Sequence, residues 1–262
     1  MLSAVEVQSM RETILRKTGI DLSLYKENQL RRRLSFILMR SGATCVAEYL
    51  EKLETDPRVL EDFKNRFTIN VSEFFRNPER FDDLEKRVIP ELLSGAGSRL
   101  NVWSAGCSIG SEAYSIAILL TEMKVTKPFW IWATDIDEEI LEKAQEAVFK
   151  ELHLKNVPDH VLSSSFYPQT DGGFRIKPVL QKNVRFQKHD LLREPVKETF
   201  DLVVCRNVVI YFEEEAKKTA FRKLSDSLKK GGYLWIGSTE RIPNPGMFHL
   251  RYSLPFFYLK YE

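Results

Sequence analysis

The spacing of apolar residues along this chain changes near residue 98. Before that point, apolar positions recur every three or four residues, which is the spacing of one face of a helix. Two of these helical patterns end at stop signals, the first at Ser41-Gly42 and the second at Asp56-Pro57. The pattern predicts an all-α N-terminal domain over residues 1–75. It also predicts a linker over residues 76–98, with a helix that ends near Pro90.

Beyond residue 98, short apolar runs alternate with amphipathic stretches. The runs cover residues 100–104, 129–134, 184–187, 200–205 and 233–237, and the stretches between them cover residues 112–123, 138–148 and 213–228. Strands that alternate with helices predict a parallel sheet with helices on both faces. Two further runs, 247–253 and 256–261, predict a terminal antiparallel hairpin that turns at Pro255. Such a hairpin favours the methyltransferase form of the nucleotide-binding fold over a dehydrogenase.

Residues 150–183 interrupt the alternation. They contain three prolines and the turn signal Asp171-Gly172-Gly173, followed by alternating polar and apolar residues. This segment predicts a small β-rich insertion with a hairpin.

The composition limits the possible functions. Lys and Arg number 39 against 37 Asp and Glu, so the chain lacks the overall basic field that dominates nucleic-acid binding. Three widely spaced cysteines and four scattered histidines predict neither a disulfide framework nor a metal site. No apolar run reaches the ~18–20 residues of a membrane span, and the N-terminus does not resemble a signal peptide. We therefore expect a cytoplasmic protein without a metal.

A predicted strand-to-helix turn at residues 102–110 carries the strongest chemical signal. It contains Gly106 and Gly110, and Glu112 opens the following helix. Glycines let a backbone approach a ligand closely, but the turn matches neither the Gly-x-Gly-x-x-Gly dinucleotide motif nor a P-loop. Taken alone, it fits a nucleoside site and an ordinary tight turn equally well.

Polar residues also follow the next strands. Asp135 and Asp137 end the second strand about 30 residues further on, the length of one βαβ unit. A carboxylate there can bind ribose hydroxyls or cap the following helix, and we assign Asp135 to the ribose and Asp137 to the cap. A later strand delivers Arg206-Asn207 to the same edge of the sheet. Tyr211 follows them, and its ring could equally serve in packing.

Four motifs, in order, resemble the CheR family of chemotaxis-receptor glutamate methyltransferases. They are residues 68–77 (TINVSEFFRN), 103–108 (WSAGCS), 133–137 (ATDID) and 205–212 (CRNVVIYF), and residues 237–240 (GSTE) continue the match. The resemblance implies an all-α N-terminal domain followed by a class I S-adenosylmethionine-dependent methyltransferase domain over residues 99–262. This α/β domain would be Rossmann-like, with a terminal antiparallel hairpin and a small β-subdomain.

The resemblance also implies a site. Arg76 and Tyr211 would lie closest to the transferred methyl group and serve as catalytic residues, although outside this motif Arg76 would pass for a surface ion-pair residue. Where the family usually has Thr, Glu and Pro, this chain has Ile109, Ser111 and Ala113, which leaves the shape of the turn open. The residues implied to contact S-adenosylmethionine or its product S-adenosylhomocysteine, together with Gly106 of the turn, are Asn70, Ser72, Arg76, Glu112, Asp135, Asp190, Leu191, Arg206 and Asn207.

A basic segment lies within the predicted helical domain. Residues 11–40 hold eight basic side chains against three acidic ones. Lys26, Arg33 and Arg40 are spaced by seven residues and are predicted to align on one helix face. With Arg31, they would dock onto the acidic methylation helices of chemotaxis receptors, as the resemblance implies. A solvated helix face is the ordinary alternative, and RNA binding is a lesser one.

Two other functions are compatible with these residues. The chain could be a non-catalytic module that senses S-adenosylmethionine or acts as a scaffold, or a methyltransferase for another protein or a small acid. A glutamate with a pKa near ~4.3 is already ionised at neutral pH and needs no general base. The lack of a nucleophile motif therefore agrees with carboxyl methylation. The sequence does not indicate which glutamates are modified.

Overall fold

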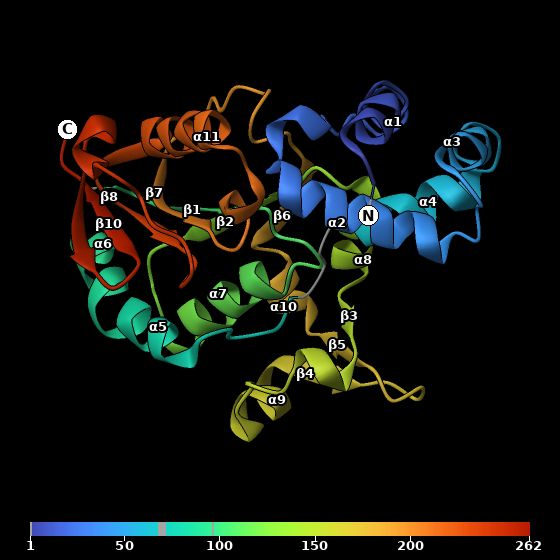
Figure 1. Cartoon of the computed structure of the whole chain (residues 1–262). Coiled ribbons are helices and arrows are strands. Elements are labelled where there is room, and N and C mark those ends of the chain that lie inside the picture. The colour runs from blue at the N-terminus through green and yellow to red at the C-terminus, as the bar shows by residue number, and fades with distance from the viewer. Residues whose placement is uncertain (1, 68–71, 96) are drawn as a thin grey trace. The chain divides into compact units, whose positions relative to one another are not determined.

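The computed structural model describes residues 2–67, 72–95 and 97–262. The chain forms two compact units, and Figure 1 labels the elements of both. The first unit comprises residues 1–70 and 211–217, and the second comprises residues 71–210 and 218–262. Among the described residues, no helix is long and apolar enough to cross a membrane.

The first unit is helical, as predicted. Helix α1 begins with a capping box between Ser3 and Glu6 and ends at Gly19, which adopts a left-handed conformation. The next two long helices end where the sequence signals predicted, before Ser41 and before Asp56. The elements are α1 (Ala4–Thr18), the 3₁₀ turn η1 (Leu22–Leu24), α2 (Glu27–Arg40), α3 (Val46–Thr55) and α4 (Pro57–Phe67).

A segment from far along the chain completes this unit. The Lys26 amide donates to the Tyr211 carbonyl oxygen at 3.0 Å, and the Glu213 amide donates to the Leu24 carbonyl oxygen at 2.9 Å. Tyr25 and Phe212 form an antiparallel bridge between the two segments. Residues 211–217 therefore belong to the helical unit, which the sequence pattern did not predict.

The predicted basic face of α2 needs a correction at Arg33. Its Nε and Nη2 donate to the Arg66 carbonyl oxygen at 3.1 and 2.9 Å. Its guanidinium carbon lies 5.4 Å from the centre of the Phe67 ring and 6.0 Å from that of Tyr211. Aromatic rings and a carbonyl oxygen thus draw Arg33 inward, so it does not form an exposed stripe with Arg40.

The second unit contains a seven-stranded sheet in the order β6-β2-β1-β7-β8-β10-β9. Its first five members pair in parallel, and β10 and β9 are antiparallel. This confirms the predicted α/β fold with its terminal hairpin. The fifth strand begins earlier than predicted, at Leu228. The strands are β1 (Leu100–Ala105), β2 (Phe129–Asp135), β6 (Val184–Lys188), β7 (Phe200–Cys205), β8 (Leu228–Ile236), β9 (Leu250–Leu254) and β10 (Phe257–Lys260).

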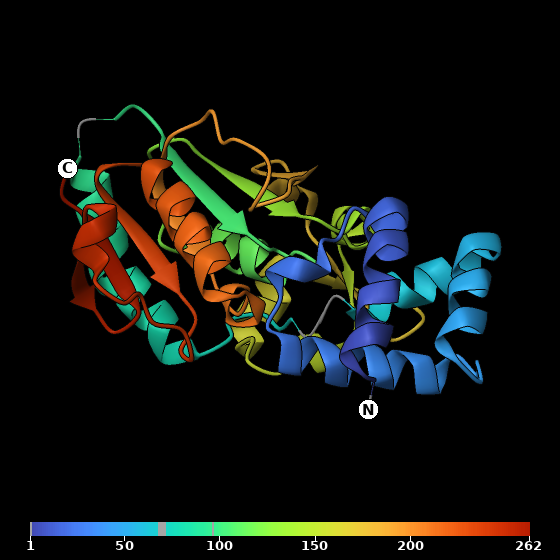
Figure 2. The ribbon, with the colours of Figure 1, turned by 45° about the horizontal axis from the view of Figure 1, so that its top comes forward.

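Helices cover both faces of this sheet. Helices α5 (Pro78–Asp83) and α7 (Ser111–Glu122) lie on one face, and α11 (Glu214–Asp226) lies along the other (Figures 1 and 2). On the first face the Phe81 ring packs edge-on against Trp235, and on the other the Trp132 ring stacks on Phe200. The helix after Asn77 runs past the predicted end at Pro90. It continues through η2 (Leu84–Val88) and α6 (Ile89–Ser94), and packs within this unit.

The predicted β-rich insertion forms a separate three-stranded antiparallel sheet in the order β3-β5-β4. The hairpin between β4 and β5 closes through the Gln169 amide, which donates to the Gly173 carbonyl oxygen at 2.8 Å. The remaining elements here are β3 (Val148–Phe149), η3 (Glu151–His153), α9 (Asp159–Ser165), β4 (Phe166–Pro168), β5 (Phe174–Ile176) and α10 (Pro178–Gln181).

The strand order places a topological switch between β1 and β7. From β1 the chain builds outward to β2 and β6, then returns to the other side of β1 as β7. In open parallel sheets, ligands bind outside the carboxyl ends of the strands where the order reverses. The turns after β1 and β7 are therefore where a ligand site is expected.

Candidate functional site

Two glycines shape the turn that follows β1. Gly106 and Gly110 adopt left-handed φ angles of 76° and 83°. A Cβ on Gly106 would lie 2.4 Å from Val208 Cγ2 in the turn after β7, so only glycine lets the two turns come this close. The turn therefore keeps its left-handed glycines despite the unusual residues at positions 109, 111 and 113. Ser111 itself forms a hydrogen bond between its hydroxyl and that of Ser72.

Of the two aspartates at the end of β2, Asp137 caps a helix as predicted, whereas the ribose role expected of Asp135 stays a prediction. Asp137 caps α8 (Glu138–Glu146), because its carboxylate accepts hydrogen bonds from the Glu139 and Ile140 amides. The Asp135 carboxylate instead accepts from the Ser108 amide at 2.8 Å and from the Asp137 amide at 3.1 Å. Burial raises the pKa of Asp135 to about 6. A partly buried acceptor therefore lies at the strand end where a ribose is expected.

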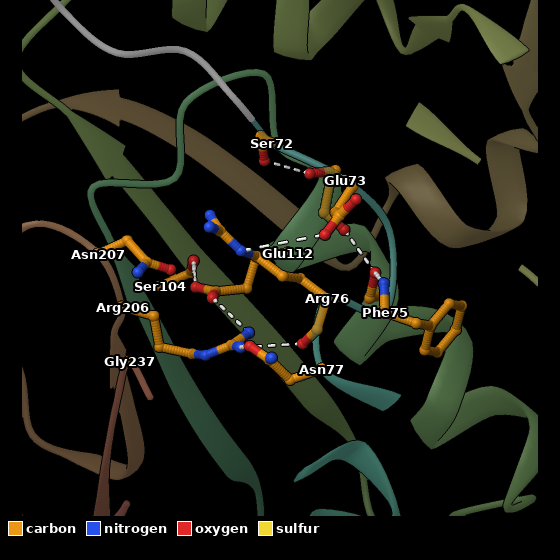
Figure 3. Close-up of polar contacts among 12 residues, drawn as sticks. Ser72, Glu73, Phe75, Arg76, Asn77, Ser104, Glu112, Arg206, Asn207 and Gly237 are labelled. Carbon is orange, nitrogen blue, oxygen red and sulfur yellow. Dashed lines mark hydrogen bonds and ion pairs between the residues drawn. The ribbon is translucent and has the colours of Figure 1, made fainter. Parts of the chain in front are cut away.

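A buried arginine leads from β7 to the segment that carries Arg76. Arg206 follows β7, and its side chain is only 3% exposed. Its Nη2 donates to the Arg76 carbonyl oxygen at 2.9 Å and to Asn77 Oδ1 at 2.7 Å (Figure 3). Its guanidinium carbon lies 4.4 Å from the centre of the Trp235 ring. Arg206 thus holds the backbone at Arg76 through charge-assisted hydrogen bonds.

Glu112 is the charge partner of this arginine. Its Oε2 lies 3.4 Å from Arg206 Nη1, and its Oε1 accepts from the Ser104 hydroxyl at 2.8 Å (Figure 3). Burial raises the pKa of Glu112 and lowers the pKa of Arg206, while the attraction between the two charges opposes both shifts. Each charge therefore favours the ionised form of the other and offsets part of the effect of burial.

The segment before α5 is strained and fastened to α7. Phe75 and Asn77 adopt left-handed φ angles of 49° and 61°, a conformation that costs a non-glycine residue about 1–3 kcal/mol. The Phe75 amide donates to the Ser115 hydroxyl at 3.0 Å, which with the Ser72–Ser111 bond ties the segment to the helix. The flanking contacts thus maintain a backbone shape that Phe75 and Asn77 would not adopt alone.

The Arg76 side chain lies near acidic and basic neighbours. Its Nε is 4.0 Å from Glu73 Oε1, and Glu73 Oε2 is 2.6 Å from Lys155 Nζ (Figure 3 shows the first pair). About a third of the Arg76 side chain is exposed, 36%. An incoming carboxylate can therefore reach this guanidinium, which already lies close to one carboxylate.

The other predicted residues are placed as follows. The Asp190 carboxylate accepts from the Leu192 and Arg193 amides at 2.8 and 3.1 Å, which forms a local turn around Leu191. Asn207 adopts a left-handed φ of 61°. Asn70 lies outside the described residues. Tyr211 ends η4 (Val209–Tyr211) and belongs to the helical unit.

The structure brings some predicted residues into direct contact and adds others. Arg76, Glu112 and Arg206 form one connected set within the second unit. Sequence reasoning gave no role to Asn77, Ser104 or Glu240, although they lie within or beside the matched motifs at 68–77, 103–108 and 237–240. The motifs therefore include these residues. Their roles could not be predicted from the motifs, because the hydrogen bonds that define those roles join segments far apart in sequence.

These residues fit S-adenosylmethionine on two counts. Arg206 Nε is buried and has no hydrogen-bond partner among the described residues, so a donor is available at the switch point. Asp135 supplies a partly buried carboxylate acceptor at the end of β2, the position at which such folds bind ribose hydroxyls. The described residues contain no cluster of His, Cys, Asp or Glu that could hold a metal ion.

Comparison with known proteins gives concordant matches over nearly the whole chain. The family model "CheR methyltransferase, all-alpha domain" matches residues 6–68, and "CheR methyltransferase, SAM binding domain" matches residues 70–254. A Listeria innocua protein named chemotaxis protein methyltransferase is 42% identical over 248 residues, 94% of each chain. A protein of the same name from Borreliella burgdorferi is 34% identical and covers 97% of this chain and 94% of its own.

Protonation of Asp135 is expected to weaken cofactor binding as the pH falls through about 6. The ionised carboxylate accepts hydrogen bonds from ribose hydroxyls, whereas the protonated form loses part of this capacity. Calorimetry with S-adenosylhomocysteine should show about tenfold weaker binding at pH 5 than at pH 7.5, since each pH unit below the pKa costs up to tenfold. The same shift affects folding in the opposite direction. The pKa of Asp135 is about 6 in the folded protein and 3.8 in the unfolded chain, so its ionisation lowers the free energy of unfolding as the pH rises through about 6.

The D135N variant is the control for this experiment. It should bind the same ligand weakly, with much less change in affinity over this pH range, since the titrating group is gone. An equal loss of affinity between pH 7.5 and pH 5 in the variant and the natural protein would exclude Asp135 as the cause.

Proposed function

The chain belongs to the CheR methyltransferase family, and from this premise we propose that it methylates chemotaxis receptors. The reaction transfers a methyl group from S-adenosylmethionine to glutamate side-chain carboxylates and forms methyl esters. The observation that carries the proposal is the connection from Glu112 through Arg206 to the backbone of Arg76, at the switch point of the sheet. This connection holds a cationic side chain where a carboxylate can reach it.

Methyl transfer to a carboxylate requires that the reacting groups be aligned, but it requires no general base. Bound S-adenosylmethionine supplies a methyl group made electrophilic by its sulfonium. A glutamate carboxylate is ionised at neutral pH, with a pKa near ~4.3, and is ready to act as the nucleophile. The protein must therefore orient this carboxylate and exclude water from the reacting groups.

Arg76 suits the orienting role. A guanidinium presents its donors as a planar fork that matches both oxygens of a carboxylate. The neighbouring Glu73 already lies 4.0 Å from Arg76 Nε and is also paired with Lys155. We propose that the substrate carboxylate binds beside Arg76 while Glu73 stays in its ion pair with Lys155. We also propose that Tyr211 helps to position the reacting groups.

We further propose that α2 provides the docking surface for the receptor. The exposed face of this helix carries Arg32 and Arg40 together with two apolar side chains, Phe36 at 50% and Met39 at 69% exposure. Their spacing of four, seven and eight residues from Arg32 puts them on one side of the helix. An amphipathic helix with acidic flanks complements such a surface. Arg33 supports this face from within the helical unit rather than contacting the partner.

A scaffold without catalytic activity is the second candidate. It would bind S-adenosylmethionine through the same residues, but it would need no arginine within the strained segment at residues 75–77. The energetic cost of that segment favours the enzyme. Tritium transferred from labelled S-adenosylmethionine to receptor-containing membranes, and released as methanol by base, would establish carboxyl methylation. The absence of base-labile label in an active preparation would favour the scaffold.

The variants R76A and Y211F are each expected to lower turnover more than cofactor affinity. Loss of a side chain that orients the reacting groups should reduce kcat about tenfold to a hundredfold. The dissociation constant for S-adenosylhomocysteine, measured by calorimetry, should change by less than the turnover does. Unchanged turnover in both variants would remove these residues from the mechanism.

Charge reversal on the exposed face of α2 should weaken receptor binding. The double variant R32E/R40E is expected to bind a receptor cytoplasmic fragment about tenfold more weakly at low salt, with the difference shrinking as salt rises. The control matched in charge is K182E/K230E, which reverses two exposed lysines in the other unit. Equal weakening in both proteins would indicate a general charge effect and not a docking surface.

A further inference from the structure

Glu240 is a buried carboxylate that holds the turn after β7. The residue is 7% exposed. Its Oε1 accepts from the Val208 amide at 3.0 Å, and its Oε2 accepts from the amides of Asn207 at 3.0 Å and Gly237 at 2.6 Å. A Cβ on Gly237 would lie 2.7 Å from Glu240 Oε2, so glycine at that position admits the carboxylate.

Such an acceptor stabilises the shape of this turn. Asn207 adopts a left-handed φ of 61°, a conformation that asparagine tolerates better than most residues but that neighbouring contacts still have to stabilise. The backbone amides of Asn207 and Val208 each need a partner, because a buried amide without one is costly. One carboxylate satisfies both, and it binds the amide that follows β8 as well.

The same turn sets the direction of Arg206. Arg206 directly precedes Asn207 in the chain, and its Nη2 reaches the Arg76 carbonyl oxygen at 2.9 Å. A change in the backbone at Asn207 alters the path of the chain directly after Arg206 and can therefore shift the donors that hold Arg76. The connected path runs from the Glu240 carboxylate to the turn, from the turn to Arg206, and from Arg206 to the strained segment.

We propose that Glu240 is a positioning residue that aims Arg206 at the backbone of Arg76 and so sets where the Arg76 guanidinium lies. The inference rests on the proposed function only in treating Arg76 as catalytic. The two carboxylate oxygens face at least three amide donors, so both act as acceptors. A glutamine of the same size keeps only one acceptor oxygen. Its NH2 group would face at least one of these amide N–H groups, so that two donors would meet without an acceptor.

The first test measures amide hydrogen exchange in the protein without ligand. E240Q should speed exchange in residues 74–78 and 205–210 by about tenfold or more, since local opening becomes easier. The matched control is D201N. Asp201 lies at the opposite end of β7, where its carboxylate accepts from the Asn101 amide and from Lys229 Nζ, both at 2.8 Å. D201N makes the same change of carboxylate to amide, at the far end of β7, and should leave exchange in residues 74–78 unchanged.

The second test measures turnover in combination with R76A. E240Q alone should lower kcat about tenfold or more, because misplacement of a positioned group is costly. In the R76A background the same change should lower kcat less than about twofold, since the group that it positions is gone. A merely structural role would produce the same loss in both backgrounds, and that result would overturn the proposal.

The two tests separate this inference from the proposed function. Faster exchange at residues 74–78 in E240Q supports the positioning role even if the natural protein methylates no receptor. Unchanged exchange there overturns it even if methylation is vigorous. Should E240Q fail to fold, E240D takes its place under the same criteria, because it keeps the charge but is too short to reach all three amides.

Discussion

Removing an arginine and a glutamate from water together costs several kcal/mol for each ion, and their mutual attraction repays this only with good geometry and further hydrogen bonds. The Arg206–Glu112 pair has these additions. Glu112 accepts from the Ser104 hydroxyl, and Arg206 donates to the Arg76 carbonyl oxygen and lies over the Trp235 ring. The rest of the candidate site is built around this pair.

A pair of this kind gives specificity of structure more than it gives stability. An apolar pair would fill the same space at lower cost but would leave the Arg76 carbonyl oxygen without its donor. The strained φ angles of Phe75 and Asn77 have the same meaning, since they persist only where the surroundings determine them. Both features reduce the stability of the fold in return for a fixed position of Arg76. This is expected where alignment of the reacting groups contributes most to catalysis.

Sequence reasoning predicted the fold well, because the signals for strands and helices are local. The alternation of short apolar runs after residue 98 predicted the parallel sheet and its terminal hairpin, and Asp137 could be assigned to a helix cap from its position alone. Contacts between segments far apart in sequence could not be predicted in this way, because local patterns do not show which segments meet. Arg33 was placed on an exposed face because helical periodicity carries no information about the aromatic rings of Phe67 and Tyr211. The role of Glu240 depends on amides 32 and 33 residues away.

The discontinuity of the helical unit has a consequence for recombining genes of this family. Its residues 1–70 are completed by residues 211–217, which are joined to them by the Tyr25–Phe212 bridge and two backbone hydrogen bonds. A hybrid that exchanges only the segment before residue 70 would pair the start of α2 from one parent with residues 211–217 from the other. Hybrids that keep both units intact therefore require three crossovers, after residues 70, 210 and 217, so that the short segment comes from the same parent as the helices that it completes.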